Sequence, residues 1–149
     1  MKMLEKTMSK THITVETTVN ASPEQVWECW THPGHIVHWN HASDDWHCPA
    51  AVNDLRPGGR FSYTMASRDD RMRFDFEGIY RAIEPGKSLA YTIADGREVT
   101  VGFYPDGTGT RVVETFEAEN SHSPELQRDG WQAILDNFRR YTEGQPAKA

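Results

Sequence analysis

SPELQRDGWQAILDNFRRYT, residues 123–142, is the segment around which the predicted fold is built. Ser123 followed by Pro124 is a typical start for an α-helix, and Gly144 with Pro146 marks its end. Burying the apolar face of this helix contributes on the order of 10 kcal/mol before entropy. We therefore expect the helix to lie on a broad apolar surface. The apolar side chains recur at helical spacing, opposite a charged face, and are Trp131, Ile134, Leu135, Phe138 and Tyr141.

Upstream of this helix, most of the chain alternates apolar and polar residues in the manner of β-strands. A first predicted strand, 12–20, precedes two short helices at 23–31 and 35–39. Tight-turn sequences such as Asp95-Gly96 separate the strands that follow. These later strands are predicted from Trp46 onward and at 60–65, 71–84, 88–94, 99–103 and 110–119.

The order of these elements predicts an α+β fold. Because short loops join successive strands, we expect antiparallel neighbours, and the one-sided alternation indicates a sheet with one dry face. Such a sheet twists and curls, so the C-terminal helix is expected to cross its concave face, where a cavity can form. Gly130 costs about 1 kcal/mol relative to alanine in a helix. From this cost we expect something to approach the helix closely at Gly130.

Length and composition indicate one domain. The 149 residues carry a formal net charge of −6, with no basic stripe for nucleic acid and no polybasic patch for a membrane surface. We expect a single domain over residues 11–143, with a flexible leader at 1–10 and a flexible tail at 144–149. No segment approaches a membrane span, and only Cys29 and Cys48 are present. These features predict a cytoplasmic protein without a disulfide framework.

Several motifs in this order resemble a known superfamily. The motifs are Trp30 within WTHP, Trp39, the turn at 53–61 and the late Gly130-Trp131 pair. Together with the order of elements they resemble the START-like or Bet v 1-like helix-grip superfamily, also called SRPBCC. The resemblance covers about residues 11–143. It implies a curved antiparallel sheet of about seven strands that grips the C-terminal helix around an apolar cavity, with two short helices after the first strand.

Within that superfamily, residues 42–49 and 74–78 look most like the branch named after the activator of the Hsp90 ATPase. Members of the superfamily bind lipids, sterols or polyketides, and some act as cyclases or dehalogenases. The eukaryotic namesake docks on a chaperone, partly through a separate N-terminal domain for which this chain has no room. One fold hosts many functions, so the resemblance alone does not select among these activities.

Aromatic side chains are the candidate ligand contacts. Most aromatic residues of a domain this size belong to its core, but a subset is expected to line the cavity. The hydroxyls of Tyr63 and Tyr91 are candidate polar contacts within it. The predicted ligand-binding residues are Trp39, Trp46, Phe61, Tyr63, Phe76, Tyr91, Phe103 and Trp131.

One pair of residues is a candidate for acid–base chemistry. Asp45 and His47 are separated by one residue at the start of a predicted strand, so their side chains can share a side. A carboxylate that orients an imidazole in this way can prepare a general base. The competing interpretation, which we favour, is a capped turn in which Asp45 bonds nearby backbone amides. Cys48 lacks the base and the electropositive setting that a nucleophile needs.

A histidine series is the candidate metal site. His32, His35, His38 and His41 recur every three residues, and His47 follows. Imidazoles are usual zinc ligands, but this spacing winds around a helix and Pro33-Gly34 interrupts it. We therefore predict no metal, although what the segment 32–47 contacts is left open.

Three functions follow from these observations. The first is a small soluble protein that binds an apolar or amphipathic molecule of the lipid, polyketide or aromatic type, without catalysis and without a cofactor. The second is an enzyme of the cyclase or hydrolase type that uses Asp45 and His47. The third is a chaperone-associated regulatory module, which would need an exposed apolar patch. We favour the first, and a homodimer is left open.

Overall fold

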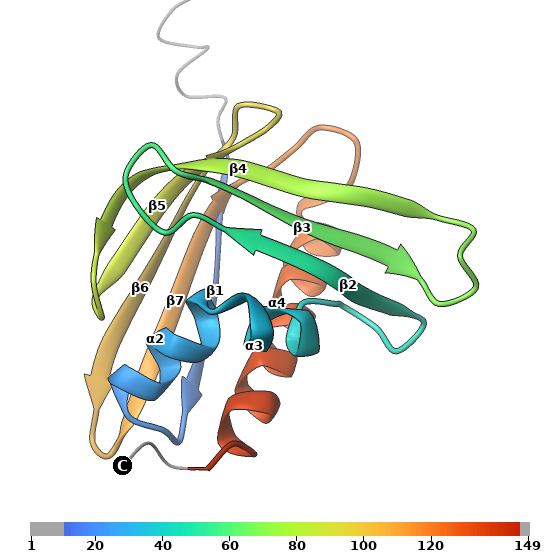
Figure 1. The fold of residues 1–149 in the computed structure, drawn as a ribbon. Coiled ribbons are helices and arrows are strands. Elements are labelled where there is room, and N and C mark those ends of the chain that lie inside the picture. The colour runs from blue at the N-terminus through green and yellow to red at the C-terminus, as the bar shows by residue number, and fades with distance from the viewer. Residues whose placement is uncertain (1–10, 147–149) are drawn as a thin grey trace, which may run out of the picture.

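The computed structural model describes residues 11–146 and contains one seven-stranded antiparallel sheet (Figure 1). The strand order is β1-β7-β6-β5-β4-β3-β2, so the first strand lies beside the last and every other neighbour follows in sequence. This order confirms the prediction that short turns join antiparallel neighbours. The strands are β1 His12–Val19, β2 Trp46–Asn53, β3 Arg60–Ser67, β4 Arg73–Glu84, β5 Ser88–Ile93, β6 Glu98–Asp106 and β7 Gly109–Glu117.

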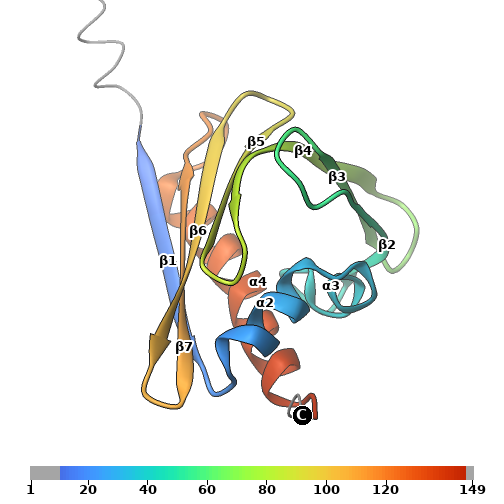
Figure 2. The ribbon, with the colours of Figure 1, turned by 60° about the vertical axis from the view of Figure 1, so that its left-hand side comes forward.

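The long helix α4, Pro124–Glu143, lies across the concave side of the curled sheet (Figure 2). Ser123 caps its start, since its hydroxyl accepts a hydrogen bond of 3.1 Å from the amide of Leu126. Two of its own side chains, Leu135 and Phe138, are fully buried. The predicted helix-grip arrangement of an α+β protein is therefore confirmed.

Two short helices, α2 Pro23–Thr31 and α3 Pro33–Trp39, close one end of the curl. The ring centroids of Trp30 and Trp39 are 5.1 Å apart. Each of these rings also makes a T-shaped contact with Phe138, with centroids 4.9 Å apart. The Trp39 indole donates a buried hydrogen bond of 2.9 Å to the carbonyl of Cys29. These aromatic contacts join the two helices to α4.

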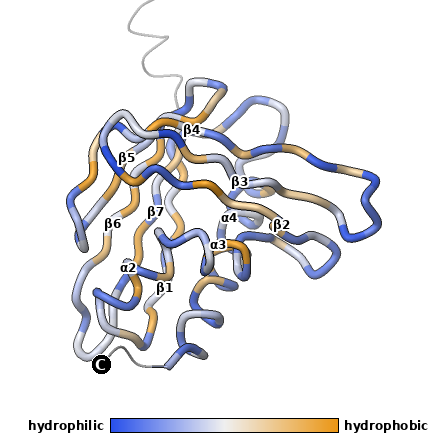
Figure 3. The backbone as a smooth tube through the Cα atoms, viewed as in Figure 1, coloured by the Kyte–Doolittle hydropathy of each residue, from blue (hydrophilic) through white to orange (hydrophobic). Residues whose placement is uncertain are grey.

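The core follows from the alternation along the strands (Figure 3). In β7, for example, Val112 and Phe116 are fully buried, while Arg111 of the same strand points to the other face and is exposed. Among the described residues no helix is long and apolar enough to cross a membrane. The predicted flexible leader at 1–10 lies outside the described residues, as do positions 147–149 of the predicted tail. Of that tail, Gly144 and Gln145 are hydrogen-bonded to the last turn of α4.

Candidate functional site

A cavity of about 740 Å³ lies between the concave sheet and α4. This volume is typical of small-molecule sites. Trp, Tyr and Phe are the commonest residues on its walls, and charged and amide side chains lie among them. Of the predicted ligand contacts, those on its lining are Trp39, Trp46, Tyr63, Phe76, Tyr91 and Trp131. The further lining residues used below are Trp30, Phe74, Tyr80, Arg97, Glu114, Glu119, His122, Leu126, Gln127 and Gly130.

Strand register brings the sheet aromatics together. Tyr63 of β3 is paired with Phe76 of β4, and Tyr80 of β4 is paired with Tyr91 of β5. Paired residues point to the same face of a sheet, so these four side chains form one continuous wall. Sequence reasoning missed Tyr80, although it alternates with Phe76 and Gly78 on one face of β4.

Two of the predicted contacts are not on the cavity lining. Phe61 lies behind the wall, with its ring centroid 4.9 Å from those of both Tyr63 and Tyr91. Gly78 makes room for that ring, because a Cβ there would lie 2.5 Å from it. Phe103 packs instead against Trp27 and Trp30 beneath α2. Both residues are on the side of the sheet that faces the cavity, but other side chains cover them.

The helix supplies the opposite wall. Trp131 stacks on Phe116 with ring centroids 3.8 Å apart, and its ring lies edge-on to Phe76 at 6.2 Å. Gly130 also lines the cavity, and a Cβ added there would meet no atom within 4 Å. The close approach to the helix that was expected at Gly130 is therefore not made by the described part of the protein. The glycine faces open space.

Among the described lining residues that lie on strands, Glu114 is the only one with a carboxyl group. It lies on β7 between Val15 of β1 and Val101 of β6, and is only 7% exposed. Burial raises its pKa from 4.5 to about 8, so the carboxyl is largely protonated at neutral pH. Sequence reasoning missed it, although Val112, Glu114 and Phe116 alternate along one strand and so place the acid on the apolar face.

Three tyrosine hydroxyls accompany Glu114 on the cavity lining. Burial raises the pKa of Tyr63 and Tyr91 well above the ordinary value and also raises that of Tyr80, so all three stay protonated. Tyr80 donates a hydrogen bond of 2.7 Å to the side chain of Asn53, whose amide nitrogen donates one of 2.7 Å to the carbonyl of Thr31. Asn53 therefore fixes Tyr80 against the end of α2.

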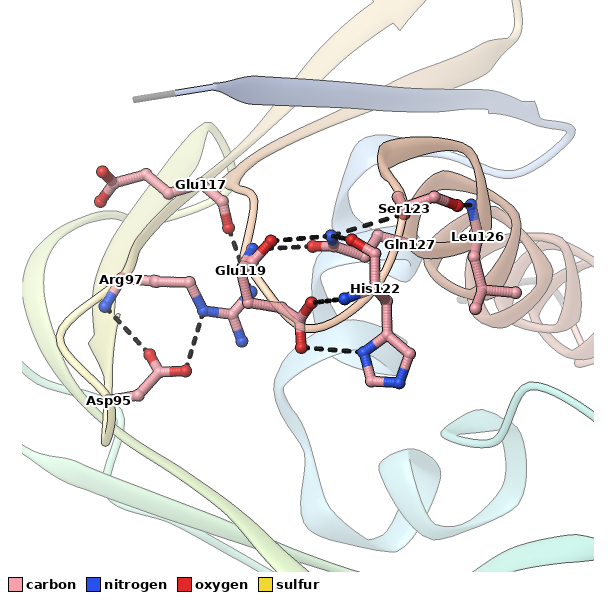
Figure 4. A network of polar contacts seen from close by, with 8 residues as sticks. All are labelled: Asp95, Arg97, Glu117, Glu119, His122, Ser123, Leu126 and Gln127. Atoms are coloured by element: carbon pink, nitrogen blue, oxygen red, sulfur yellow. Dashed lines mark hydrogen bonds and ion pairs between the residues drawn. The ribbon is translucent and has the colours of Figure 1, made fainter. Parts of the chain in front are cut away.

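A polar network surrounds one mouth of the cavity (Figure 4). Arg97 pairs with Asp95 at 2.9 Å and also donates to the carbonyl of Glu117 at 3.1 Å. Across from it, the His122 ring lies 2.9 Å from the carboxylate of Glu119. A polar recess of about 480 Å³ outside this mouth shares Arg97, Glu119 and His122 with the cavity.

The Asp45–His47 pair lies outside the described cavity lining. Asp45 is exposed, and its carboxylate accepts a hydrogen bond of 2.5 Å from the Ser43 hydroxyl, as in a capped turn. His47 is half-buried at the start of β2. Burial raises the pKa of the nearby Cys48 thiol to about 11, so this thiol is protonated at neutral pH and is not an activated nucleophile.

The histidine series contacts the protein itself. His32 accepts a hydrogen bond of 3.0 Å from the amide of Gly34, and His35 is 2.6 Å from the hydroxyl of Tyr141. His38 stacks on the Tyr141 ring with centroids 5.5 Å apart. Burial lowers the pKa of His41. Residues 11–146 contain no group of three or more acidic, histidine or cysteine side chains arranged to hold a metal ion. The absence of metal from the protein stays a prediction.

A sheet that curls around a C-terminal helix and encloses an aromatic cavity defines a helix-grip protein of the START-like or Bet v 1-like class. Residues 20–143 match the family model described as activator of Hsp90 ATPase homolog 1-like protein, and the chain belongs to that family.

Solved structures support the same assignment. An AHSA1-like protein from Aeromonas hydrophila is 42% identical, with a TM-score of 0.84 over 93% of this chain and 100% of that one. A protein from Cytophaga hutchinsonii is 50% identical, with a TM-score of 0.77 over 88% and 91% of the two chains. One from Chromobacterium violaceum, at 21% identity and a TM-score of 0.80 over 90% and 98%, shares the fold. No curated protein matches significantly.

Proposed function

We propose that the chain binds a small apolar or amphipathic molecule of the lipid, polyketide or aromatic type in the cavity between its sheet and α4. The observation that carries this proposal is the cavity of about 740 Å³ with aromatic walls on both sides. Filling it would bury apolar ligand surface at roughly 25 cal/mol per Å² before the costs of association. Leu126 and Phe74, 57% and 52% exposed, extend the apolar lining to the surface.

A binding role is favoured over catalysis by the placement of the reactive side chains. Asp45 and His47 lie off the described lining, and the Cys48 thiol is protonated. A cytoplasmic location stays a prediction, and it is compatible with the buried Cys29 and Cys48 forming no disulfide with each other. A homodimer and a chaperone partner stay predictions from the sequence alone.

Gly130 offers a sharp test, because a larger side chain there would project into open space within the cavity. Wild-type protein is expected to bind the neutral fluorophore N-phenyl-1-naphthylamine at about one molecule per chain, with a Kd in the micromolar range, or about 7–8 kcal/mol. Gly130→Phe is expected to weaken this binding at least tenfold by filling the cavity. Titration of probe fluorescence gives both quantities.

The matched control is Asp129→Phe, which places the same side chain on the exposed neighbouring position of α4. It is expected to keep wild-type affinity, and thermal melts should show that both variants fold. No saturable binding by the wild type below 100 μM, or equal loss of binding in both variants, would refute the proposal.

A further inference from the structure

The inner wall of the cavity holds a carboxyl group with no partner among the described residues. Within residues 11–146 the Glu114 side chain takes part in no hydrogen bond and no ion pair, although it is 93% buried, being 7% exposed. Buried polar groups are nearly always paired, and an exception needs an explanation. Glu114 lies on the cavity lining, so a bound molecule can supply the missing partner.

The surroundings of Glu114 favour one chemistry for that partner. Aromatic faces attract a cation through the ring quadrupole, most strongly when water is excluded, and tryptophan does so best. Trp131 on α4 and Tyr91 on β5 line the same cavity, and Glu114 is close enough to Tyr91 to oppose ionisation of its hydroxyl. An unpaired acid among aromatic rings is a site for an organic cation.

No basic side chain among the described residues pairs with Glu114, because Arg97 and His122, the basic residues of the lining, lie at the mouth beside Asp95 and Glu119. On the strands that line the cavity, the other titratable groups are Tyr63, Tyr80 and Tyr91, and all three are protonated. The lining part of α4 contributes Gln127 and Trp131, which carry no charge. The flanking residues on β1 and β6 are valines, and α2 and α3 contribute uncharged side chains to the lining.

The charges at the mouth also favour a cation. Arg97 is held there by the carboxylate of Asp95, and the carboxylate of Glu119 lies beside the ring of His122. Two carboxylates therefore accompany one guanidinium where a ligand would enter. The chain as a whole carries −6, which further raises the local concentration of cations.

We infer that the cavity recognises a protonated amine carried on an apolar or aromatic body, with Glu114 as its counter-ion. The inference rests on the proposed function and names the class of ligand. On binding, the Glu114 carboxyl releases its proton to solvent and accepts a charge-assisted hydrogen bond from the ammonium group, which is about twice as strong as a neutral one. The ligand keeps its own proton, so no covalent bond forms or breaks elsewhere.

Three dansyl probes with the same five-carbon linker separate the charge of the end group from its size. Dansylcadaverine ends in an ammonium, its methyl-ended analogue is neutral, and the carboxyl-ended analogue is an anion. At pH 8 the wild type is expected to bind the ammonium probe at least tenfold more tightly than the neutral one, and the anion most weakly. In Glu114→Gln, which keeps shape but cannot ionise, the preference of ammonium over neutral should vanish.

The pH dependence of probe affinity gives an independent test. Because Glu114 must lose its proton, affinity for the ammonium probe should rise about tenfold per pH unit below the pKa of the carboxyl and level off above about 8. The amine itself stays charged to about pH 10. The rise should be absent in Glu114→Gln, and a rise of the same slope in that variant would overturn the inference.

The outcomes separate the two proposals. If no probe binds, the proposed function fails and the ligand class fails with it. If the neutral probe binds but the ammonium probe has no advantage, or if affinity falls as pH rises, only the ligand class is overturned. A falling affinity would mean that protonated Glu114 donates to a neutral acceptor. Thermal melts of Glu114→Gln and of a second variant, Glu114→Leu, establish that the loss of preference occurs in folded protein.

Discussion

Replacing Glu114 by glutamine is expected to stabilise the unliganded protein, by an amount that grows with pH. Glutamine has the same shape and no charge to bury. In the folded state burial raises the pKa of the Glu114 carboxyl to about 8, whereas in the unfolded chain it has the ordinary value near 4.5. Between these two values the unfolded chain releases a proton that the folded protein keeps, so wild-type stability falls as pH rises.

The magnitude follows from the width of that pH window. Each pH unit between 4.5 and about 8 costs the wild type about 1.4 kcal/mol of unfolding free energy, and above that pKa the loss levels off. Glu114→Gln avoids this cost. Its advantage over wild type should therefore be near zero at pH 4.5, about 3 kcal/mol at pH 7 and about 4 kcal/mol at pH 8.

Urea unfolding at pH 5, 6, 7 and 8, followed by tryptophan fluorescence, measures this difference directly. Glu77→Gln is the matched control, because Glu77 is exposed on the outer face of β4 and its replacement removes a carboxylate that is not buried. A constant offset between wild type and Glu114→Gln across pH 5–8 would refute the reasoning. It would mean that the carboxyl titrates normally and is solvated in the folded protein.

Gly130→Ala should raise the unfolding free energy by up to about 1 kcal/mol, measured by urea unfolding, since alanine is the better helix former and its Cβ meets no atom; a loss of stability would show that the space is filled. Asn53→Ala should cost about 1–3 kcal/mol by the same measurement, because it leaves Tyr80 without its hydrogen-bond acceptor; an unchanged midpoint would contradict that role. Asp45→Ala and His47→Ala should keep probe affinity within about threefold, or about 0.7 kcal/mol, and a large loss in folded protein would place chemistry at this pair.

The sequence by itself determined the fold. The helical spacing of Trp131, Leu135 and Phe138, the alternation along seven strands and the tight turns between them are local signals, and they agreed with one another. Short turns leave only antiparallel neighbours, so the order of six of the strands followed from their order in the chain. The helix start at Ser123 was equally local, because a cap depends on residues within one turn.

The composition of the cavity was decided by the tertiary structure. Alternation tells which face of a strand a side chain occupies, but not how deep it lies or what covers it. Phe61 and Tyr63 share a face of β3, yet only Tyr63 reaches the cavity because the curl of the sheet stacks it over Phe61. Likewise, Glu114 is a strand residue in the sequence, and its pKa is raised because the curled sheet and α4 together exclude water from it. Such an environment is made by segments that meet only when the chain folds.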